Sequence, residues 1–349
     1  MKTVRVNASK SYDVIIGKNL LGSLGEYTLR LIGKCRACIV TDDKVDALYS
    51  KAAEQSLAQS GIEYEKFVIP NGEASKNTEN LVELLEFLAE NRFTRSDCII
   101  ALGGGVVGDL AGFAAGVFLR GIRFIQVPTT LLAAVDSSVG GKTAVDLRAG
   151  KNLAGVFHQP SLVLCDVCML DTLEEKIFAD GCAEVVKYAI INDRPLFERL
   201  KLGIKENIEQ IIADCVAHKA EIVCEDEFDT GVRKLLNLGH TVAHAIEQCS
   251  SLSISHGSAV AIGMCIVTKM AVELGLCPKE DLAQIRELLT AIGLPTRCDY
   301  SAVELTQVAT ADKKRNGNTI DLIVPYGIGN SKILTLNVSE LCSYIEKGL

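Results

Sequence analysis

An apolar strand-like run that enters a helix through three glycines constrains this chain more than any other feature. Residues 98–102 form the run, Gly103, Gly104 and Gly105 follow it, and an apolar helix-like segment occupies 106–119. Glycines let a backbone approach a ligand closely, and the free N–H groups of a helix N-terminus face an anion at the same point. The stretch is therefore typical of a turn that holds a phosphate group.

The first half of the chain alternates strand-like with helix-like segments. We expect strands at 3–16, 36–40, 65–70, 98–102, 124–127 and 162–165, and helices at 45–60, 78–91 and 106–119. This alternation is typical of a parallel sheet covered by helices on both faces. Ligands of such sheets bind beyond the carboxyl ends of the strands. The residues expected to converge there are Asp42, Glu73, Gly103 to Gly105, Thr129 and Thr130.

After residue 170 the pattern becomes mainly helical. We expect helices at 171–191, 204–225, 232–249, 257–275 and 278–292, then a hairpin of strands 320–325 and 332–336, and a short helix at 338–347. The sequence thus predicts an α/β N-terminal domain with a mainly parallel, Rossmann-like sheet over 1–170 and a mostly α-helical C-terminal domain over 171–349. Two domains with a short junction leave a cleft, which is a common place for an active site.

Two glycine motifs need to be weighed separately. Residues 103–108 match G-x-G-x-x-G, but they lie in the third strand–helix unit, and no acidic residue follows at about twenty positions to hold a ribose. The motif indicates a dinucleotide held outside the standard Rossmann layout; close packing of a helix on the sheet is the alternative. Residues 140–143 resemble the end of a P-loop, but Asp136 stands where that loop needs glycine, which excludes the NTPase interpretation.

Charge and hydropathy exclude several classes of function. The net charge of −8 offers no footprint for nucleic acid or for an anionic membrane, so any phosphate must be bound by local cations. The most apolar window, 98–119, is long enough to span a bilayer but carries Asp109 near its middle, which is costly there. The N-terminus shows no signal-peptide pattern, so we expect a cytoplasmic protein.

Thirteen cysteines are scattered through apolar segments. Two C-x-x-C pairs, Cys35–Cys38 and Cys165–Cys168, have the spacing of a structural zinc site. Each pair falls in or beside an expected strand, which would turn side chains to opposite faces. We therefore interpret these cysteines as core residues of a cytoplasmic protein.

Histidines and charged residues cluster in the helical half. Three of the five histidines, His240, His244 and His256, lie within seventeen residues of one another. His240 and His244 are one turn apart, a chelating spacing, although the Glu of H-E-x-x-H is absent. Glu184 and Lys187 share one face of an earlier helix. The pattern favours a Zn²⁺ site built from two histidines and a carboxylate, with an open position for substrate; polar helix faces and caps are the alternative.

Further cations lie near this cluster in the sequence. In the expected helix 232–249, Arg233, Asn237 and His240 would share one face. Lys219 adds a positive charge on another helix. The run 312–317, which contains Lys313 and Lys314, adds more, although such a run is usually a solvated loop.

Taken together, these segments resemble the 3-dehydroquinate synthase family of sugar-phosphate cyclases. The resemblance runs through most of the chain, and its motifs occur in the family's order. They are PNGEASK at 70–76, GGGVVGDLAGFAAG at 103–116, RG at 120–121, VPTTLLAAVDSSVGGKTAVD at 127–146, GKN at 150–152, GCAEVVKYA at 181–189, RKLLNLGHTVAHA at 233–245, HG at 256–257 and DKK at 312–314.

The resemblance implies roles for individual residues. The metal ligands, for Zn²⁺ or Co²⁺, would be Glu184, His240 and His256, and His244 would contact substrate instead. The NAD contacts would be Asp42, Glu73, Lys76, Gly104, Gly105, Val106, Asp109, Thr129, Thr130, Lys142, Lys151 and Thr172. The substrate contacts would be Arg120, Asp136, Lys142, Lys151, Asn152, Lys187, Lys219, Arg233, Asn237, His244 and Lys314, with Lys313 as the alternative to Lys314. The catalytic residues would be Lys142, Lys187, Lys219, Arg233 and His244.

The same resemblance implies the reaction. A family member converts 3-deoxy-D-arabino-heptulosonate 7-phosphate to 3-dehydroquinate and phosphate, in the shikimate pathway of aromatic amino-acid biosynthesis. The reaction begins with transient oxidation by NAD, which is followed by phosphate elimination, re-reduction, ring opening and an intramolecular aldol closure. The strongly anionic substrate accounts for local cations on an acidic protein. The family also implies a homodimer, and no nucleic acid or membrane partner is expected.

Three alternatives remain at this point. A sister cyclase, of the 2-deoxy-scyllo-inosose or valiolone synthase type, would act on a sugar phosphate without the carboxylate. A metal-dependent polyol dehydrogenase would share the architecture but release NADH. A non-catalytic NAD- or phosphate-sensing module is a third possibility, against which the intact metal triad argues.

Overall fold

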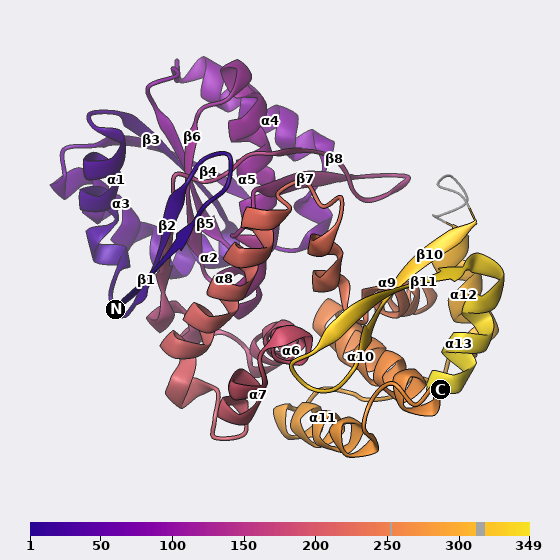
Figure 1. Ribbon diagram of the computed structural model, residues 1–349. Helices are drawn as coiled ribbons and strands as arrows, with labels where there is room; N and C mark the ends of the chain where they lie inside the picture. The colour runs from indigo at the N-terminus through magenta and orange to yellow at the C-terminus, as the bar shows by residue number, and fades with distance from the viewer. Residues whose placement is uncertain (252, 312–317) are drawn as a thin grey trace. The chain divides into compact units, whose positions relative to one another are not determined.

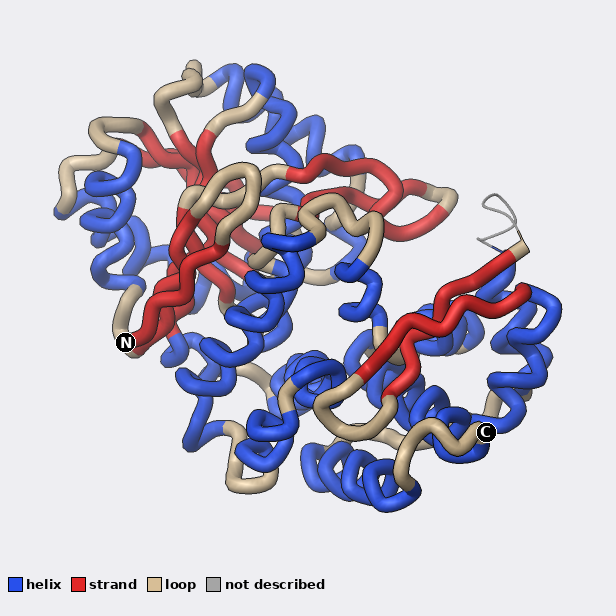
Figure 2. Tube along the Cα trace, viewed as in Figure 1, coloured by secondary structure: helices blue, strands red, loops and turns tan. Residues whose placement is uncertain are grey.

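A computed structural model describes residues 1–251, 253–311 and 318–349 and divides the chain into two compact units (Figure 1). The first unit contains Met1–Leu173 and Ile208–Phe228, and the second contains Glu174–Asn207 and Asp229–Leu349. Strands gather in the first unit and helices dominate the second (Figure 2). The first unit is thus α/β and the second is mainly helical, as expected from the sequence.

A seven-stranded sheet forms the core of the first unit, in the order β1-β2-β9-β6-β5-β3-β4. Only the β1–β2 pair is antiparallel among these strands, and the other neighbours are parallel. The expected mainly parallel sheet is therefore confirmed. The strands are β1 (Lys2–Val6), β2 (Tyr12–Gly17), β3 (Arg36–Asp42), β4 (Glu63–Ile69), β5 (Cys98–Gly103), β6 (Arg123–Pro128) and β9 (Leu162–Asp166).

Helices cover both faces of this sheet. Along β3, Ala37 and Ile39 belong to one buried cluster and Cys38 and Val40 to the opposite one, because successive strand side chains alternate between faces. The first cluster packs against α1 (Leu24–Ile32) and α3 (Lys51–Gln59), and the second against α4 (Thr78–Glu90) and α5 (Gly105–Val117). The continuous apolar runs of the strands follow from this burial on two sides.

The carboxyl ends of β3, β5 and β6 lie next to one another in the sheet. Asp42 ends β3, Gly103 ends β5 and Thr129 follows β6, and the N–H of Thr129 donates to the carbonyl of Gly103 at 3.0 Å. The expected convergence of these positions at one sheet edge is confirmed.

The helix α8 (Ile208–Glu225) belongs to the first unit, although it follows residue 170. It packs on β1 and β2, where the N-terminal amine of Met1 contacts Glu209 at 3.2 Å. Just beyond the helix, the carboxylate of Glu227 accepts from the N–H and hydroxyl of Ser9, each at 2.7 Å. The expected domain 171–349 therefore loses residues 208–228 to the first unit, because their apolar face and these contacts cover the antiparallel edge of the sheet.

A second hairpin was not expected from the sequence. Strands β7 (Lys142–Leu147) and β8 (Gly150–Phe157) pair antiparallel, with an irregularity between Val145 and Leu147. In the sequence, the glycine-rich segments beside these strands indicate a loop that binds a ligand. The hairpin instead packs on α5, where Gly112 approaches Thr143 and Gly116 approaches Val156 without an intervening side chain.

The second unit is built around α10 (His256–Glu273), which is buried along most of its length. It packs against α6, α9, α11 and α13. The expected hairpin is present as β10 and β11. The remaining elements are α6 (Glu175–Asn192), α7 (Arg194–Leu200), α9 (His240–Cys249), α11 (Lys279–Ile292), α12 (Ala302–Ala311), β10 (Thr319–Pro325), β11 (Ser331–Asn337) and α13 (Leu341–Gly348).

The single helix expected over 232–249 is wrong. A 3₁₀ segment, η8 (Val232–Asn237), ends at the extended Leu238, and α9 begins only after Gly239, which has a φ of 78°. Arg233 and Asn237 therefore do not share an α-helical face with His240. The cause is a left-handed glycine that lets the chain turn sharply before α9.

Short helical turns connect the main elements, at Leu21–Ser23, Asp43–Val45, Asp46–Ser50, Glu73–Ser75, Phe118–Arg120, Ala133–Ser137, Val167–Thr172, Lys205–Asn207 and Val338–Glu340. Within the described residues, no helix has the length and hydropathy needed to cross a membrane. Cys35, Cys38 and Cys165 are buried and Cys168 is half-buried, and all four are free thiols. Burial raises the pKa of Cys38 and of Cys165 to about 12, which suits core residues better than zinc thiolates.

Candidate functional site

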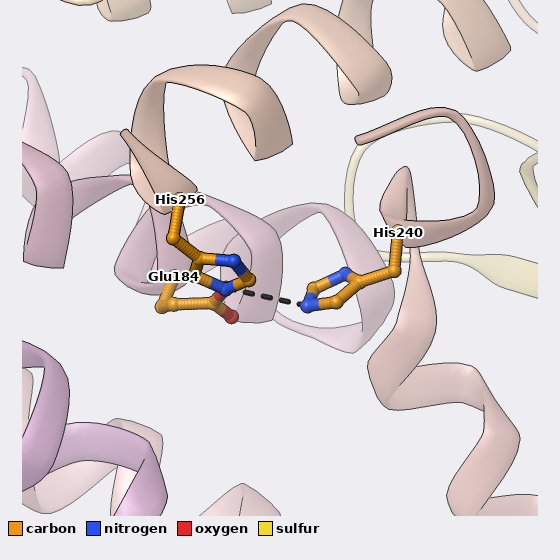
Figure 3. Close-up of side chains that lie close together, drawn as sticks. All are labelled: Glu184, His240 and His256. Atoms are coloured by element: carbon orange, nitrogen blue, oxygen red, sulfur yellow. Dashed lines mark ion pairs between the residues drawn. The ribbon is translucent and has the colours of Figure 1, made fainter. Parts of the chain in front are cut away.

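Three ligand-type side chains of the second unit meet at one point (Figure 3). Glu184 lies in the middle of α6, whereas His240 and His256 are the first residues of α9 and α10. Oε1 of Glu184 lies 3.5 Å from Nε2 of His240 and 3.4 Å from Nε2 of His256. Both imidazoles point toward the same carboxylate from different helices.

The backbone at Gly257 fixes His256 relative to Glu184. A Cβ at position 257 would lie 2.5 Å from Cα of Asp180, so α10 begins in direct contact with the backbone of α6. The Asp180 carboxylate accepts from the hydroxyl of Ser255 at 2.7 Å and from the N–H of Ser258 at 3.2 Å, which caps α10. Asp180 is one turn before Glu184, so one stretch of α6 sets both the ligand and the helix that carries its partner.

A second glycine contact places His240. A Cβ at Gly239 would lie 2.7 Å from the backbone nitrogen of Met264, and a Cβ at Gly263 would collide with the carbonyl group of Gly239. The start of α9 therefore rests on the backbone of α10. Glycine is required at 239 for its positive φ as well as for this approach.

Burial and charge set the protonation of the two histidines. Burial lowers the pKa of His240 to about 3, against the opposing effect of Glu184. Burial also lowers the pKa of His256, but hydrogen bonds and charge from Glu184 and Glu247 outweigh it and raise that pKa to about 10. Nδ1 of His256 lies 3.6 Å from Oε1 of Glu247, and Nδ1 of His240 lies 3.1 Å from the carbonyl of Leu238.

The donor set fits a divalent metal ion. Two imidazole nitrogens and one carboxylate oxygen are typical ligands of catalytic zinc, which keeps its fourth position for water or substrate. Donors placed about 2.0 to 2.1 Å from a tetrahedral ion are about 3.3 Å apart. The observed separations of 3.5 and 3.4 Å are close to that value. The three ligands expected from the sequence are thus brought together.

His244 and Lys187 lie beside this centre. The His244 ring centroid is 5.5 Å from that of His240 and 6.4 Å from that of His256, so His244 is adjacent to the cluster but outside it. Lys187, one turn after Glu184 on α6, contacts its carboxylate and is 1% exposed. In the same unit Arg233 is buried and Asn237 is exposed on η8, and Lys314 lies outside the described residues.

The start of α5, at the carboxyl ends of the strands, is the position where the sequence predicts that an anion binds. The N-cap of α5 is Gly104, which has no side chain, and the first turn of the helix carries no acidic residue. A Cβ at Gly104 would lie 3.1 Å from Thr130, and one at Gly105 would lie 3.2 Å from the hydroxyl of Ser137. The backbone N–H groups at this helix start can therefore face a pyrophosphate, as the resemblance implies for NAD.

Charged residues at the same edge are held in place by one another. Nζ of Lys76 contacts Asp109 at 2.9 Å and Glu73 at 3.8 Å, and Lys76 is buried. Burial lowers the pKa of Lys76, but the charges of Asp109, Glu73 and Asp146 and the hydrogen bond to Asp109 together outweigh it and raise that pKa. Burial raises the pKa of Asp109, although the charge of Lys76 opposes that rise. The ionised form of this carboxyl group is therefore less stable here than in water. We read the close 2.9 Å contact as an ion pair.

The remaining cofactor candidates differ in exposure. The carboxylate of Asp42 accepts from the N–H groups of Lys44 and Val45, each at 3.0 Å, and so caps a short helix. Thr129 is buried, and Val106 is half-buried at the start of α5. The hydroxyl of Thr172 lies 2.5 Å from that of Tyr49.

The substrate candidates of the first unit fall into two groups. Nζ of Lys219, on α8, donates to the carbonyl of Asp136 at 2.8 Å and also contacts its carboxylate, and Lys219 is 5% exposed. Lys142 and Lys151 are exposed on the β7–β8 hairpin, where Asn152 has a φ of 58° and its N–H donates to Asp146 at 2.7 Å.

One further candidate, Arg120, is exposed and has a φ of 69°. Sequence reasoning missed two residues that shape the metal centre, Asp180 and Glu247. The available signals were their helical spacing from ligands, four residues before Glu184 and seven after His240.

Comparisons with known proteins agree with this geometry. The family described as 3-dehydroquinate synthase N-terminal matches residues 66–180, and that described as 3-dehydroquinate synthase C-terminal matches residues 181–315. The 3-dehydroquinate synthase of Agrobacterium fabrum is 45% identical over 357 residues, covering 97% of this chain and 94% of the relative. That of Enterococcus faecalis (strain OG1RF) is 42% identical and covers 99% of each.

Solved structures of sister enzymes share the whole fold. A 2-deoxy-scyllo-inosose synthase complexed with carbaglucose-6-phosphate, NAD⁺ and Co²⁺ has a TM-score of 0.88 at 27% identity over all of both chains. A 2-epi-5-epi-valiolone synthase of Streptomyces hygroscopicus with NAD⁺ and Zn²⁺ bound has a TM-score of 0.87 at 28% identity over 99% of both. An iron-containing alcohol dehydrogenase, at 16% identity and a TM-score of 0.71, shares the fold alone.

A parallel α/β sheet in one unit and a mainly helical second unit define a fold that this chain shares with the sister cyclases and with the iron-containing alcohol dehydrogenase. Among proteins of that fold, the sequence matches decide the family. The chain belongs to the 3-dehydroquinate synthase family.

Proposed function

We propose that the protein converts 3-deoxy-D-arabino-heptulosonate 7-phosphate to 3-dehydroquinate and phosphate, using NAD and a divalent metal ion. The observation that carries the proposal is the buried centre of Glu184, His240 and His256, in a chain that matches this family over nearly its whole length. The reaction belongs to the shikimate pathway and is that of a phosphorus–oxygen lyase.

Identity favours this function over that of the sister cyclases. The dehydroquinate synthases are 42 to 45% identical to this chain, whereas the inosose and valiolone synthases are 27 to 28% identical. The positions expected to recognise the substrate also keep the dehydroquinate pattern, among them Lys219, Arg233, Asn237 and His244. A polyol dehydrogenase is disfavoured because its resemblance is limited to the fold.

The residues of the second unit would hold the metal and work beside it. Glu184, His240 and His256 would bind Zn²⁺ or Co²⁺, which when bound acidifies a coordinated hydroxyl group and so favours its oxidation. Lys187 places its side-chain nitrogen against the ligand carboxylate of Glu184. His244 lies one turn from His240 and is proposed to donate to or accept from the substrate, as are Arg233 and Asn237.

The residues of the first unit would bind the dinucleotide. NAD bound there would supply reversible hydride transfer, with the hydride taken from an alcohol and returned within the same turnover. Gly104, Gly105 and Val106 would present backbone N–H groups to the pyrophosphate. The other proposed contacts are Asp42, Glu73, Lys76, Asp109, Thr129, Thr130, Lys142, Lys151 and Thr172.

Cations of the first unit are proposed to recognise the anionic groups of the substrate. Lys142, Lys151 and Asn152 on the hairpin would hold phosphate or carboxylate, with Arg120 as a further cation. Asp136 orients Lys219, whose ammonium is buried and fixed by two contacts to that residue. Such positioning lowers the barrier by bringing reacting groups together. Lys142, Lys187, Lys219, Arg233 and His244 are the proposed catalytic residues.

We further propose that the protein is a homodimer in the cytoplasm, in line with its family. A substrate comparison tests the function. The purified protein, with NAD⁺ and Zn²⁺, is given the heptulosonate phosphate or glucose 6-phosphate, which lacks the carboxylate. Dehydroquinate from the first substrate alone supports the proposal, and a cyclic product from glucose 6-phosphate alone assigns a sister cyclase instead.

A further inference from the structure

Glu247 faces the metal centre from the far end of α9. A helix turns once every 3.6 residues, so a residue seven positions after His240 returns to within about 20° of its direction. His240, His244 and Glu247 consequently lie along one face of α9, which brings two histidines and a carboxylate to the same side of the helix. Oε1 of Glu247 lies 3.6 Å from Nδ1 of His256, on the neighbouring helix.

The ring of His256 is thus placed between two carboxylates. Its Nε2 faces Glu184 at 3.4 Å and its Nδ1 faces Glu247 at 3.6 Å. An imidazole bound to a metal through one nitrogen carries its N–H on the other, and a neighbouring acceptor decides which nitrogen that is. The Glu247 carboxylate beside Nδ1 favours the N–H there, which leaves the lone pair of Nε2 for a metal.

His240 also has an acceptor beside Nδ1, but that acceptor is a backbone carbonyl. Its Nδ1 lies 3.1 Å from the carbonyl of Leu238, so a neutral backbone group holds the proton. Its side chain is 13% exposed, whereas that of His256 is 35% exposed. The more exposed histidine is the one whose Nδ1 faces a carboxylate.

Glu247 is also buried, at 5% exposure. Acidic side chains are rarely buried to this degree unless they are paired, because an isolated charge is costly away from water. A carboxylate behind a ligand histidine makes that imidazole a more basic donor, and loss of such a partner typically lowers metal affinity about 10- to 100-fold.

We propose that Glu247 is the positioning residue of the metal centre: its carboxylate orients His256 through Nδ1 and strengthens Nε2 as a metal ligand. This inference rests on the metal centre of the proposed function. It assigns to Glu247 no contact with substrate or cofactor, so its effect on activity passes through the bound ion.

The test compares E247Q and E247A with the wild-type protein and with D281N. Asp281 is a matched control in the same unit, because its carboxylate is 4% exposed and accepts from the N–H of Ile328 at 2.8 Å. Zn²⁺ affinity is measured by competition with a chromophoric chelator, and the visible absorption of the Co²⁺-loaded protein reports the ligand field. Circular dichroism establishes which variants are folded.

We expect E247Q to bind Zn²⁺ about 10-fold more weakly than wild type, and E247A to bind it more weakly than E247Q. The Co²⁺ absorption bands of E247Q should also shift, whereas D281N should keep the wild-type affinity and spectrum. Wild-type affinity and spectrum in E247Q overturn the inference, and E247Q alone decides if E247A does not fold. Equal losses in E247Q and D281N also overturn it, because they show a general loss of stability. A wild-type protein that binds no ion refutes the metal centre itself, which is a different failure.

Discussion

The contact between Gly257 and Asp180 makes a quantitative prediction about the metal centre. In G257A the new methyl group would lie 2.5 Å from Cα of Asp180 and closer still to its carbonyl oxygen, whereas ordinary contact begins at 3.4 Å. The neighbours are backbone atoms of α6 and have no rotamer with which to avoid the methyl. The start of α10 must therefore move away from α6 by about 1 Å, since packed interiors have no free space to absorb it.

This displacement acts directly on two ligands. Glu184 is fixed to α6 and His256 begins α10, so the 3.4 Å separation of their donor atoms grows by a similar amount. Metal–ligand distances in working sites vary by only about 0.2 Å. We expect Zn²⁺ affinity to fall at least 10-fold, with a loss in the free energy of unfolding of about 1 to 3 kcal/mol from overpacking.

Chelator competition measures the affinity, and chemical unfolding of the metal-free protein measures the stability. G22A is the control, because a Cβ at position 22 meets nothing within 4 Å and the residue has no positive φ. A folded G257A that binds Zn²⁺ as tightly as G22A and the wild type would refute this account of how the centre is built.

Three further predictions concern other parts of the chain. D136N removes the carboxylate beside the buried ammonium of Lys219 but leaves its contact with the backbone carbonyl, so it should lower the free energy of unfolding by about 2 kcal/mol, the size of a hydrogen bond to a charged group. D136L/K219M should recover most of that stability but no activity; urea unfolding and turnover measure the two effects. R233A should raise the KM for the heptulosonate phosphate or sharply depress kcat, and unchanged kinetics would refute the assignment of Arg233 to an anionic group of the substrate. The protein should bind one metal ion per chain, and elemental analysis should give the same stoichiometry for C38S/C165S, because burial raises the pKa of both thiols to about 12. Loss of a metal ion in that variant would contradict the interpretation of these cysteines as core residues.

Much of the fold follows from local pattern. The run 98–102, the glycine triplet and the apolar segment after it predict β5 and α5, because a strand buried on both faces and a helix packed on it each leave a clear signature. The three metal ligands were identified through the family resemblance. The residues alone indicated only two of the histidines and a carboxylate.

The sequence predictions that were wrong or missing depend on contacts between residues far apart in the chain. The leucines around residue 236 continue a helical pattern through Gly239, and only the backbone of Met264 shows why the chain must turn there. The apolar face of α8 predicts a helix but not that β1 and β2 cover it. The β7–β8 hairpin was not predicted, because in a sequence the glycines that permit close packing on α5 cannot be distinguished from glycines that approach a phosphate.

The central claim is that the chain catalyses an overall redox-neutral cyclisation. The most direct measurement follows phosphate, dehydroquinate and NADH together, with the heptulosonate phosphate in large excess over NAD⁺ and with Zn²⁺ present. A dehydroquinate synthase gives one phosphate and one dehydroquinate per substrate, many turnovers for each NAD⁺, and no accumulation of NADH. Stoichiometric NADH with no dehydroquinate would instead assign the protein to the dehydrogenases that share its fold.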